Sequence, residues 1–282
     1  MIILVRHAQS EGNQNREIHQ TVPDHRVNLT EEGKRQATEA GWRLRKLLHP
    51  DDSIQVYTSP YSRARQTTKG IVDVLSSDSP PSPFKGRAIR VYEEPRLREQ
   101  DFGNFQPCTY QMERIWQERA DYGHFFYRIP NGESAADVYD RVGGFNESLW
   151  RQFGEDDFAS VCVLVTHGLM ARIFLMKWYH FSVEFFEDLV NLRHVQFIVL
   201  KIQDNGKYFL DTHLRTWSEE AREKHIEDKP EEVRRRRWGG CPDGCDHAPG
   251  NLRLRANVDM RDPSKKEHGI LLLYAVMLTT GE

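Results

Sequence analysis

The stretch Met1-Ile2-Ile3-Leu4-Val5-Arg6-His7 begins with five apolar residues and ends in an arginine and a histidine. A continuous apolar run of this length is typical of a strand that is buried on both faces of an α/β sheet. The same pattern returns at Val161–Val165, which is followed by Thr166, His167 and Gly168. Both runs therefore predict central strands of a sheet that helices cover on each side.

The segments around these two runs alternate between strand and helix patterns. Thr30 is expected to cap a helix that runs to about Leu48, and Ser59-Pro60 is a typical start for a helix that runs to about Leu75. The other expected elements are strands at 54–58, 89–92 and 161–165, helices at 169–178 and from Ser134 onward, and a hairpin formed by 195–202 and 208–210. This β-α alternation predicts a three-layer α/β/α sandwich with a mainly parallel central sheet.

The chain is expected to contain one main domain and an appendage. Residues 1–214 carry the alternating pattern, interrupted at 104–130 by an aromatic-rich segment that we interpret as an inserted cap or lid. Beyond residue 214 the charge becomes dense, with an unbroken basic run at Arg234–Arg237, so 215–282 is expected to be a charged, partly disordered C-terminal appendage. Cys241, Cys245 and His247 suggest zinc, but no second pair of ligands accompanies them and coincidence is preferred.

The composition argues against several classes of function and several cellular locations. A net charge of −3 over 282 residues gives no global basic field, so nucleic acid is not an expected partner. Four cysteines are too few for a disulfide framework, which favours a reducing compartment. The apolar N-terminus is too short for a signal peptide, and the run Ile270–Leu278 is about half of the roughly 20 residues of a membrane helix. A cytoplasmic protein without a membrane span is expected, and no pattern indicates an oligomeric state.

Charged and imidazole side chains follow three of the predicted strands. Arg6 and His7 follow the first strand, Arg63 falls in the first turn of the helix after the second, and His167 follows the strand at 161–165. Because ligands of open α/β sheets bind beyond the carboxyl ends of the strands, we expect these side chains to converge there. Their chemistry predicts an anion site. Zinc is the weaker alternative, since neither helical spacing of histidines nor a carboxylate pattern supports it.

Six blocks of sequence carry a family resemblance. They are Leu4–Asn13 (LVRHAQSEGN), Leu29–Gly33 (LTEEG), Thr58–Thr67 (TSPYSRARQT), Leu97–Gly103 (LREQDFG), Pro130–Ser134 (PNGES) and Val165–Gly168 (VTHG). In this order they resemble the histidine phosphatase superfamily, whose fold is phosphoglycerate-mutase-like. The resemblance covers roughly residues 1–212 and is strongest to small fungal and plant broad-range or acid phosphatases.

The resemblance implies a metal-independent phosphomonoester hydrolase that uses no cofactor. His7 would attack a small phosphorylated substrate and carry the phosphoryl group, since a neutral imidazole is a good nucleophile near neutral pH. The phosphate-binding residues would be Arg6, His7, Asn13, Arg63 and His167. The resemblance also selects Glu99 from among its neighbouring carboxylates as general acid and later general base, because the leaving alcohol needs a proton.

The same fold supports a mutase as an alternative. The mutase pattern carries a tryptophan before the asparagine of the first block, where this chain has Gly12 before Asn13. It also carries a glycine and a lysine after the glutamate block, where this chain continues with Gln106 and Pro107. These departures favour the hydrolase.

Two further alternatives differ in what they require of the chain. A fructose-bisphosphate-type sugar phosphatase would need extra basic residues at the pocket, for which the candidates are Arg90, Arg96, Arg98 and Arg128. A catalytically silent binding or scaffold protein is disfavoured, because every expected catalytic position is filled.

Overall fold

Six strands form a single sheet in the order β3-β2-β4-β1-β5-β6 in the computed structural model, which describes residues 1–219. The strands are β1 (Ile2–Arg6), β2 (Ile54–Thr58), β3 (Arg90–Glu93), β4 (Val161–Thr166), β5 (Phe197–Ile202) and β6 (Tyr208–Leu210). β1 pairs in parallel with β4, as do β2 with β4 and β2 with β3, whereas β5 and β6 add an antiparallel edge. The mainly parallel sheet and the C-terminal hairpin are therefore confirmed.

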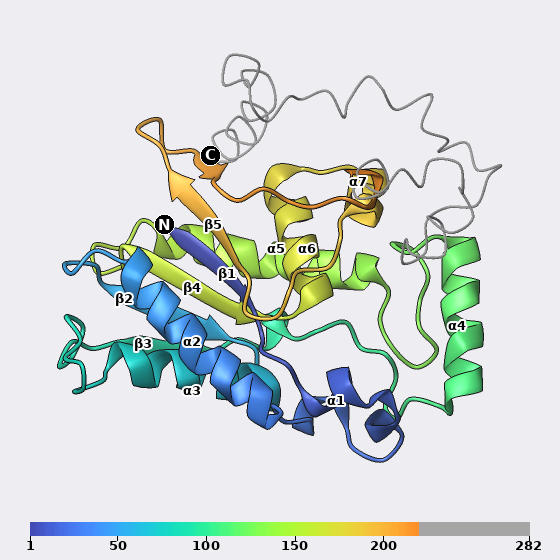
Figure 1. Ribbon diagram of the computed structural model, residues 1–282. Coiled ribbons are helices and arrows are strands. Elements are labelled where there is room, and N and C mark those ends of the chain that lie inside the picture. The colour runs from blue at the N-terminus through green and yellow to red at the C-terminus, as the bar shows by residue number, and fades with distance from the viewer. Residues whose placement is uncertain (220–282) are drawn as a thin grey trace. The chain divides into compact units, whose positions relative to one another are not determined.

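Helices cover both faces of this sheet (Figure 1). One face packs against α2 (Glu31–Leu47) and α3 (Ser62–Leu75), and the other against α5 (Ala135–Gln152) and α6 (Gly168–Tyr179). Successive residues of β1 alternate between the two cores: Ile3 joins the first, Leu4 joins the second, and both are 0 % exposed. A strand with an apolar environment on each side explains the unbroken apolar run from which it was predicted.

Two helices begin at the caps that the sequence predicts. The Thr30 hydroxyl accepts a hydrogen bond from the Gly33 N–H at 2.9 Å, and α2 follows. The Ser134 hydroxyl accepts from the Asp137 N–H at 3.1 Å while the Asp137 carboxylate accepts from the Ser134 N–H at 2.7 Å. This reciprocal arrangement satisfies two amides at the start of α5.

The expected start of α3 at Ser59-Pro60 is wrong. The helix begins at Ser62, and the residue before it, Tyr61, has extended backbone. The Ser59 hydroxyl accepts from the Tyr61 N–H at 3.3 Å, and it also lies 2.7 Å from Nε2 of His167. The expected cap residue therefore bonds the amide just before the helix and a histidine of the site, not an amide of α3 itself.

Short helical segments appear where the sequence indicates only loop. They are α1 (Glu11–Gln14), α7 (Val183–Asp188) and 3-10 turns at Arg16–Gln20, Asp24–Arg26 and Pro95–Leu97. The expected cap segment contains α4 (Thr109–Tyr122). Figure 1 shows α1 and α4 at the end of the sheet where the parallel strands finish.

The C-terminal predictions fall almost entirely beyond the described residues. Only 215–219 of the expected appendage are described, and Arg234–Arg237 and Cys241, Cys245 and His247 lie outside that range. Within residues 1–219, no helix is long and apolar enough to cross a membrane.

Candidate active site

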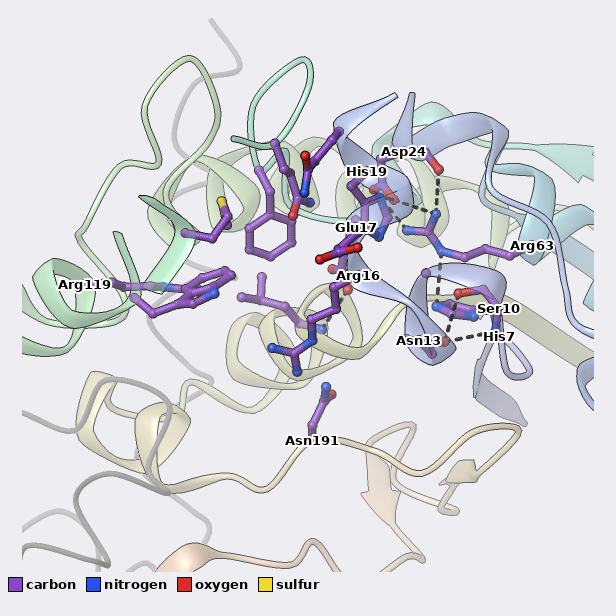
Figure 2. Close-up of a pocket in the computed structure, with 18 of the residues that line it drawn as sticks. His7, Ser10, Asn13, Arg16, Glu17, His19, Asp24, Arg63, Arg119 and Asn191 are labelled. Carbon is purple, nitrogen blue, oxygen red and sulfur yellow. Dashed lines mark hydrogen bonds and ion pairs between the residues drawn. The ribbon is translucent and has the colours of Figure 1, made fainter. Parts of the chain in front are cut away.

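A cavity of about 330 Å³ opens beyond the carboxyl ends of the parallel strands. Its walls come from the end of β1, from α1 and the 3-10 turns that follow it, and from the starts of α3 and α6, with α4 on the far side. Figure 2 shows His7, Asn13 and Arg63 on one side of this pocket and Arg119 on the opposite side. The volume is in the range of sites for small molecules.

His7 is held in one tautomer. Its Nδ1 lies 2.7 Å from the carbonyl oxygen of Ala8. A carbonyl can only accept, so Nδ1 carries the hydrogen and Nε2 keeps its lone pair. Burial, followed by the positive charges of Arg63 and Arg6, holds the pKa of His7 well below its ordinary value of 6.5. The ring is therefore a neutral imidazole whose lone pair lies on Nε2, the form needed for a nucleophile.

Arg63 presents its guanidinium beside that lone pair. Its Nε donates to Nε2 of His7 at 3.3 Å, and its side chain is almost completely buried. The two terminal nitrogens donate to the carboxylate oxygens of Asp24 at 2.9 and 3.1 Å. The guanidinium thus presents two donors in the bidentate geometry that suits carboxylate and phosphate oxygens.

Arg6 lies on the same side of the pocket. One of its terminal nitrogens donates to the carbonyl of Leu192, while its buried Nε has no hydrogen-bond partner among the described residues. Burial lowers the pKa of its guanidinium, and Glu99 opposes that effect. A bound anion would supply the acceptor that Arg6 lacks.

His167 lies directly behind His7. The two rings meet edge to face, with centroids 5.0 Å apart, and His167 is 0 % exposed. Its Nε2 is 2.7 Å from the Ser59 hydroxyl, and its Nδ1 has no partner in the described part of the chain. Burial and the charge of Arg63 hold the pKa of His167 well below 6.5, so this ring is also neutral.

Asn13 lies at the exposed edge of the same wall. Its Oδ1 accepts from the N–H and the hydroxyl of Ser10, at 3.0 and 2.9 Å. These two bonds orient the side chain and leave its NH₂ group as the part able to donate to a ligand.

Glu99 follows the 3-10 turn Pro95–Leu97 and lies at the start of α6. Its Oε1 accepts from the backbone N–H groups of Gln100 and Met170, both at 3.1 Å, and Oε2 accepts a longer bond of 3.3 Å from Leu169. These backbone donors fix the orientation of the carboxyl group. All six residues predicted from the sequence are thus brought to one end of the sheet.

Several pocket residues are not predicted from the sequence. They are Arg16, His19, Asp24, Arg119, His124 and Arg172. One signal existed: Arg172 is the only charged residue in the apolar run 169–176, which indicates a buried charge with a special role. Asp24 lies in a polar loop, where nothing in the pattern distinguishes it.

The four arginines considered for a second anion lie outside the pocket lining. Each forms an ion pair elsewhere: Arg90 with Asp157, Arg96 with Glu94, Arg98 with Glu133 and Arg128 with Asp137. None of the four candidates therefore supplies a basic residue to the pocket lining.

The geometry agrees with comparison to known families. A model of the histidine phosphatase superfamily (branch 1) matches residues 2–215. The chain belongs to the histidine phosphatase superfamily. Among its curated histidine phosphatase relatives, the phosphoglycerate mutase-like protein AT74 of Arabidopsis thaliana is 43 % identical over 232 residues, covering 77 % of this chain and 71 % of the relative. The broad-range acid phosphatase DET1 of Saccharomyces cerevisiae is 34 % identical over 303 residues, covering 78 % and 90 %.

Solved structures of histidine phosphatases share the fold. Mycobacterial hydrolase 1 superposes with a TM-score of 0.56 at 22 % identity, covering 76 % of this chain and 98 % of its own. A mycobacterial glucosyl-3-phosphoglycerate phosphatase superposes with a TM-score of 0.55 at 22 % identity, covering 75 % and 96 %. The expected phosphoglycerate-mutase-like α/β/α fold is thus confirmed, and phosphatase activity is supported by the family.

Proposed function

We propose that this protein is a metal-independent acid phosphatase that hydrolyses phosphomonoesters through a phosphohistidine on His7. The observation that carries the proposal is the state of His7, a neutral ring whose Nδ1–H is bonded to Ala8 and whose Nε2 lone pair faces the Arg63 guanidinium. The 34 % identity to a yeast protein named a broad-range acid phosphatase supports the same conclusion.

Binding of the phosphoryl group begins with an exchange of partners. Arg63 holds the Asp24 carboxylate in the free enzyme, and a phosphate would take over those N–H donors. The unpartnered Nε of Arg6 and the NH₂ of Asn13 add donors from the same wall. Charged forks around the equatorial oxygens stabilise the charge of the transferring phosphoryl group.

His167 contributes through its N–H to a non-bridging oxygen. In the free enzyme its Nε2 contacts Ser59, and its ring packs edge to face against that of His7. A neutral ring donates one hydrogen bond without repelling the arginines around it.

The first chemical step forms the Nε2–P bond of His7 while the bond between phosphorus and the ester oxygen breaks. The leaving oxygen takes a proton from the carboxyl group of Glu99, so an alcohol departs. The reaction leaves a phosphohistidine and the Glu99 carboxylate.

The second step returns the enzyme to its starting state. Glu99 removes a proton from water as the water oxygen attacks phosphorus and the Nε2–P bond breaks. Inorganic phosphate leaves, His7 recovers its lone pair and Glu99 is again protonated.

A mutase is the second candidate, because the relative with 43 % identity is named phosphoglycerate mutase-like. A mutase would return the phosphoryl group from His7 to another oxygen of the substrate and would exclude water from the intermediate. The departures at Gly12 and at 106–107 count against it.

The test is hydrolysis of p-nitrophenyl phosphate in the presence of a metal chelator, between about pH 4 and pH 8. We expect phosphate release by the wild type, none above background by His7→Ala, and full activity in the control His49→Ala, whose imidazole is exposed and remote from the pocket. Activity in His7→Ala would refute the phosphohistidine mechanism. If the wild type releases no phosphate, an isomerisation assay with 3-phosphoglycerate, primed with 2,3-bisphosphoglycerate, tests the mutase.

A further inference from the structure

The pocket lining also holds two neighbouring arginines that the proposed reaction does not use. Arg119 comes from α4 and Arg172 from α6, and both line the pocket although they are only 2 % and 4 % exposed. In the described part of the chain neither guanidinium forms an ion pair. Two buried, unpaired cations in one wall are unusual, because burying a charge without a partner is unfavourable.

Hydrogen bonds use only some of the N–H donors of each guanidinium group. Arg119 donates to Oε1 of Gln100 at 2.9 Å and to Nε2 of His124 at 3.0 Å, and Arg172 donates to the carbonyl of Leu189 at 3.0 Å. Because His124 accepts at Nε2, its neutral ring carries the hydrogen on Nδ1.

Three N–H groups in this wall remain without an acceptor. They are Nε of Arg119, Nε of Arg172 and Nδ1 of His124, each buried and without a partner among the described residues. Native structures satisfy nearly all buried donors, so a set of three beside a cavity indicates a ligand with acceptor atoms.

The electrostatics of the wall also favour an anion. Burial and the nearby Arg172 lower the pKa of Arg119 to about 9, and burial lowers the pKa of Arg172 to about 10. Glu99 acts on both pKa values in the opposite direction, and Glu187 does so on that of Arg119, but neither carboxylate forms an ion pair with these arginines among the described residues. The remaining carboxylates that line the pocket are Glu17 and Glu113, which are exposed, and Asp24, which pairs with Arg63. A bound anion would relieve the repulsion between the two guanidinium groups.

Aromatic rings fix the position of both cations. Arg119 lies over the rings of Trp116 and Phe102, at 5.3 and 5.9 Å from their centroids, and Arg172 lies 5.2 Å from that of Phe186. The donors are thus preorganised, which reduces the ordering that binding would otherwise require. Figure 2 shows that Arg119 is separated from His7 by the width of the pocket.

We propose that Arg119, Arg172 and His124 form a second anion subsite, which selects substrates that carry a carboxylate or a second phosphate at the end remote from the phosphoryl group. This inference rests on the proposed function, because the first anion is the phosphoryl group that His7 attacks. The preferred substrate is a small phosphomonoester with a second anionic end.

Two pairs of matched substrates test the subsite. 3-Phosphoglycerate and glycerol 3-phosphate share a three-carbon skeleton and differ in whether the remote end is a carboxylate or an alcohol. Fructose 1,6-bisphosphate and fructose 6-phosphate provide the corresponding comparison for a second phosphate. We expect kcat/KM of the wild type to be about 10- to 100-fold higher for the doubly anionic member of at least one pair, as charge-assisted bonds to a buried guanidinium allow. The pair that shows the preference identifies the second group.

Variants test whether Arg119 is responsible for the preference for doubly anionic substrates. The preference is the ratio of kcat/KM for the doubly anionic substrate to kcat/KM for its partner. Arg119→Gln should lower this ratio about tenfold or more. The matched control is Arg114→Gln in the same helix, where Arg114 is 76 % exposed and pairs with Glu118, and it should keep the preference of the wild type. Equal losses of kcat/KM for both members of the pair in Arg119→Gln would overturn the subsite. The absence of any preference in the wild type would also overturn it, and that measurement does not depend on the folding of a variant.

A binding measurement separates this inference from the proposed function. Calorimetry of His7→Ala with 3-phosphoglycerate, glycerol 3-phosphate and the two fructose phosphates measures the preference without turnover. Stronger binding of a doubly anionic ligand supports the subsite even if the wild type hydrolyses nothing. Hydrolysis of p-nitrophenyl phosphate without any such preference in binding would refute the subsite and leave the phosphatase proposal standing.

Discussion

The protonation state of His7 decides the proposed chemistry at the scale of single residues. Its ring is 4 % exposed and lies next to two guanidinium groups, so the positively charged form is disfavoured by burial and by repulsion. The neutral ring is the nucleophile, and lowering its pKa keeps it neutral as the pH falls through the ordinary histidine value of about 6.5. The nucleophile is therefore compatible with activity in acid.

We expect His7 to titrate well below pH 6.5 in the free enzyme, since protonation must overcome both burial and the charges of Arg63 and Arg6. Ring nitrogen chemical shifts of ¹⁵N-histidine-labelled protein, followed by NMR as the pH is lowered, measure this directly. The His7→Gln spectrum identifies the resonance by its absence. A midpoint at or above about 6.5 would contradict the environment described for His7.

Loss of the Glu99 carboxyl group should slow hydrolysis most for substrates with a poor leaving group. Glu99→Gln removes the proton donor, so hydrolysis of glycerol 3-phosphate should fall about 100-fold or more, while nitrophenol release from p-nitrophenyl phosphate in the first turnover should fall much less. Glu93→Gln, an exposed position on β3, is the control. Similar losses for both substrates would show that Glu99 is not the acid.

Residues at strand ends were predictable and residues in loops were not. Arg6, His7 and His167 directly follow strands whose apolar runs are unmistakable, so the sheet brings them together. Asp24 reaches Arg63 because the loop between β1 and α2 folds back toward the pocket. The hydrophobic periodicity of the sequence does not predict the conformation of such a loop.

At the scale of elements, the loop that carries the site is held by a close backbone contact with α2. A Cβ added at Gly33, in the first turn of α2, would lie 2.0 Å from the carbonyl oxygen of Gln9. That carbonyl also accepts from the Thr30 N–H at 3.1 Å. The start of α2 thus fixes the segment between His7 and Asn13.

Gly33→Ala should lower the free energy of unfolding by about 2 kcal/mol or more, because backbone must shift to admit the methyl group. Gly144→Ala in α5 is the opposite case, since the nearest atom to its added Cβ is 3.8 Å away at the end of Arg96. It should raise the free energy of unfolding by up to about 1 kcal/mol. Urea denaturation of both variants measures the difference, and an unchanged stability of Gly33→Ala would disprove the contact.

Helix existence was more predictable than helix boundaries. The caps of α2 and α5 act locally, so Thr30 and Ser134 could be recognised from neighbouring residues. The start of α3 was missed because Ser59, the expected cap, bonds only the amide before the helix and also contacts His167. The helices α1 and α7 span only four and six residues, which is too short for a helical period in the sequence.

For the molecule as a whole, buried neutral histidines link stability to pH. The pKa values of His7, His124 and His167 are all held well below 6.5, chiefly by burial. As the pH falls below about 6.5, the unfolded chain binds protons that the folded chain does not, so stability is highest above that pH and declines below it.

Between about pH 6 and pH 5, each of these histidines should contribute a decline of up to about 1.4 kcal/mol per pH unit in the free energy of unfolding. His124→Gln, which keeps an acceptor for Arg119, should flatten the slope by that amount, and the exposed His49→Gln should not. Urea denaturation at several pH values provides the slopes. Parallel slopes for His124→Gln and the wild type would contradict the buried neutral state of His124.

The architecture of the sheet follows from apolar runs and their alternation with helices, which is why the fold could be predicted as a whole. The second anion subsite could not be predicted in this way. Arg119 and Arg172 come from α4 and α6, which are distant in sequence and contribute these side chains to the same pocket.

The most direct test of the central proposal is to trap the phosphoryl group on His7. In Glu99→Gln, p-nitrophenyl phosphate can still form the intermediate, but the base that activates water is missing, so the intermediate should accumulate. After an alkaline quench, mass spectrometry of tryptic peptide 7–16, in which His7 is the only histidine, should find the phosphoryl group on His7. A stoichiometric burst of nitrophenol with the phosphoryl group on another residue, or on none, would contradict the mechanism.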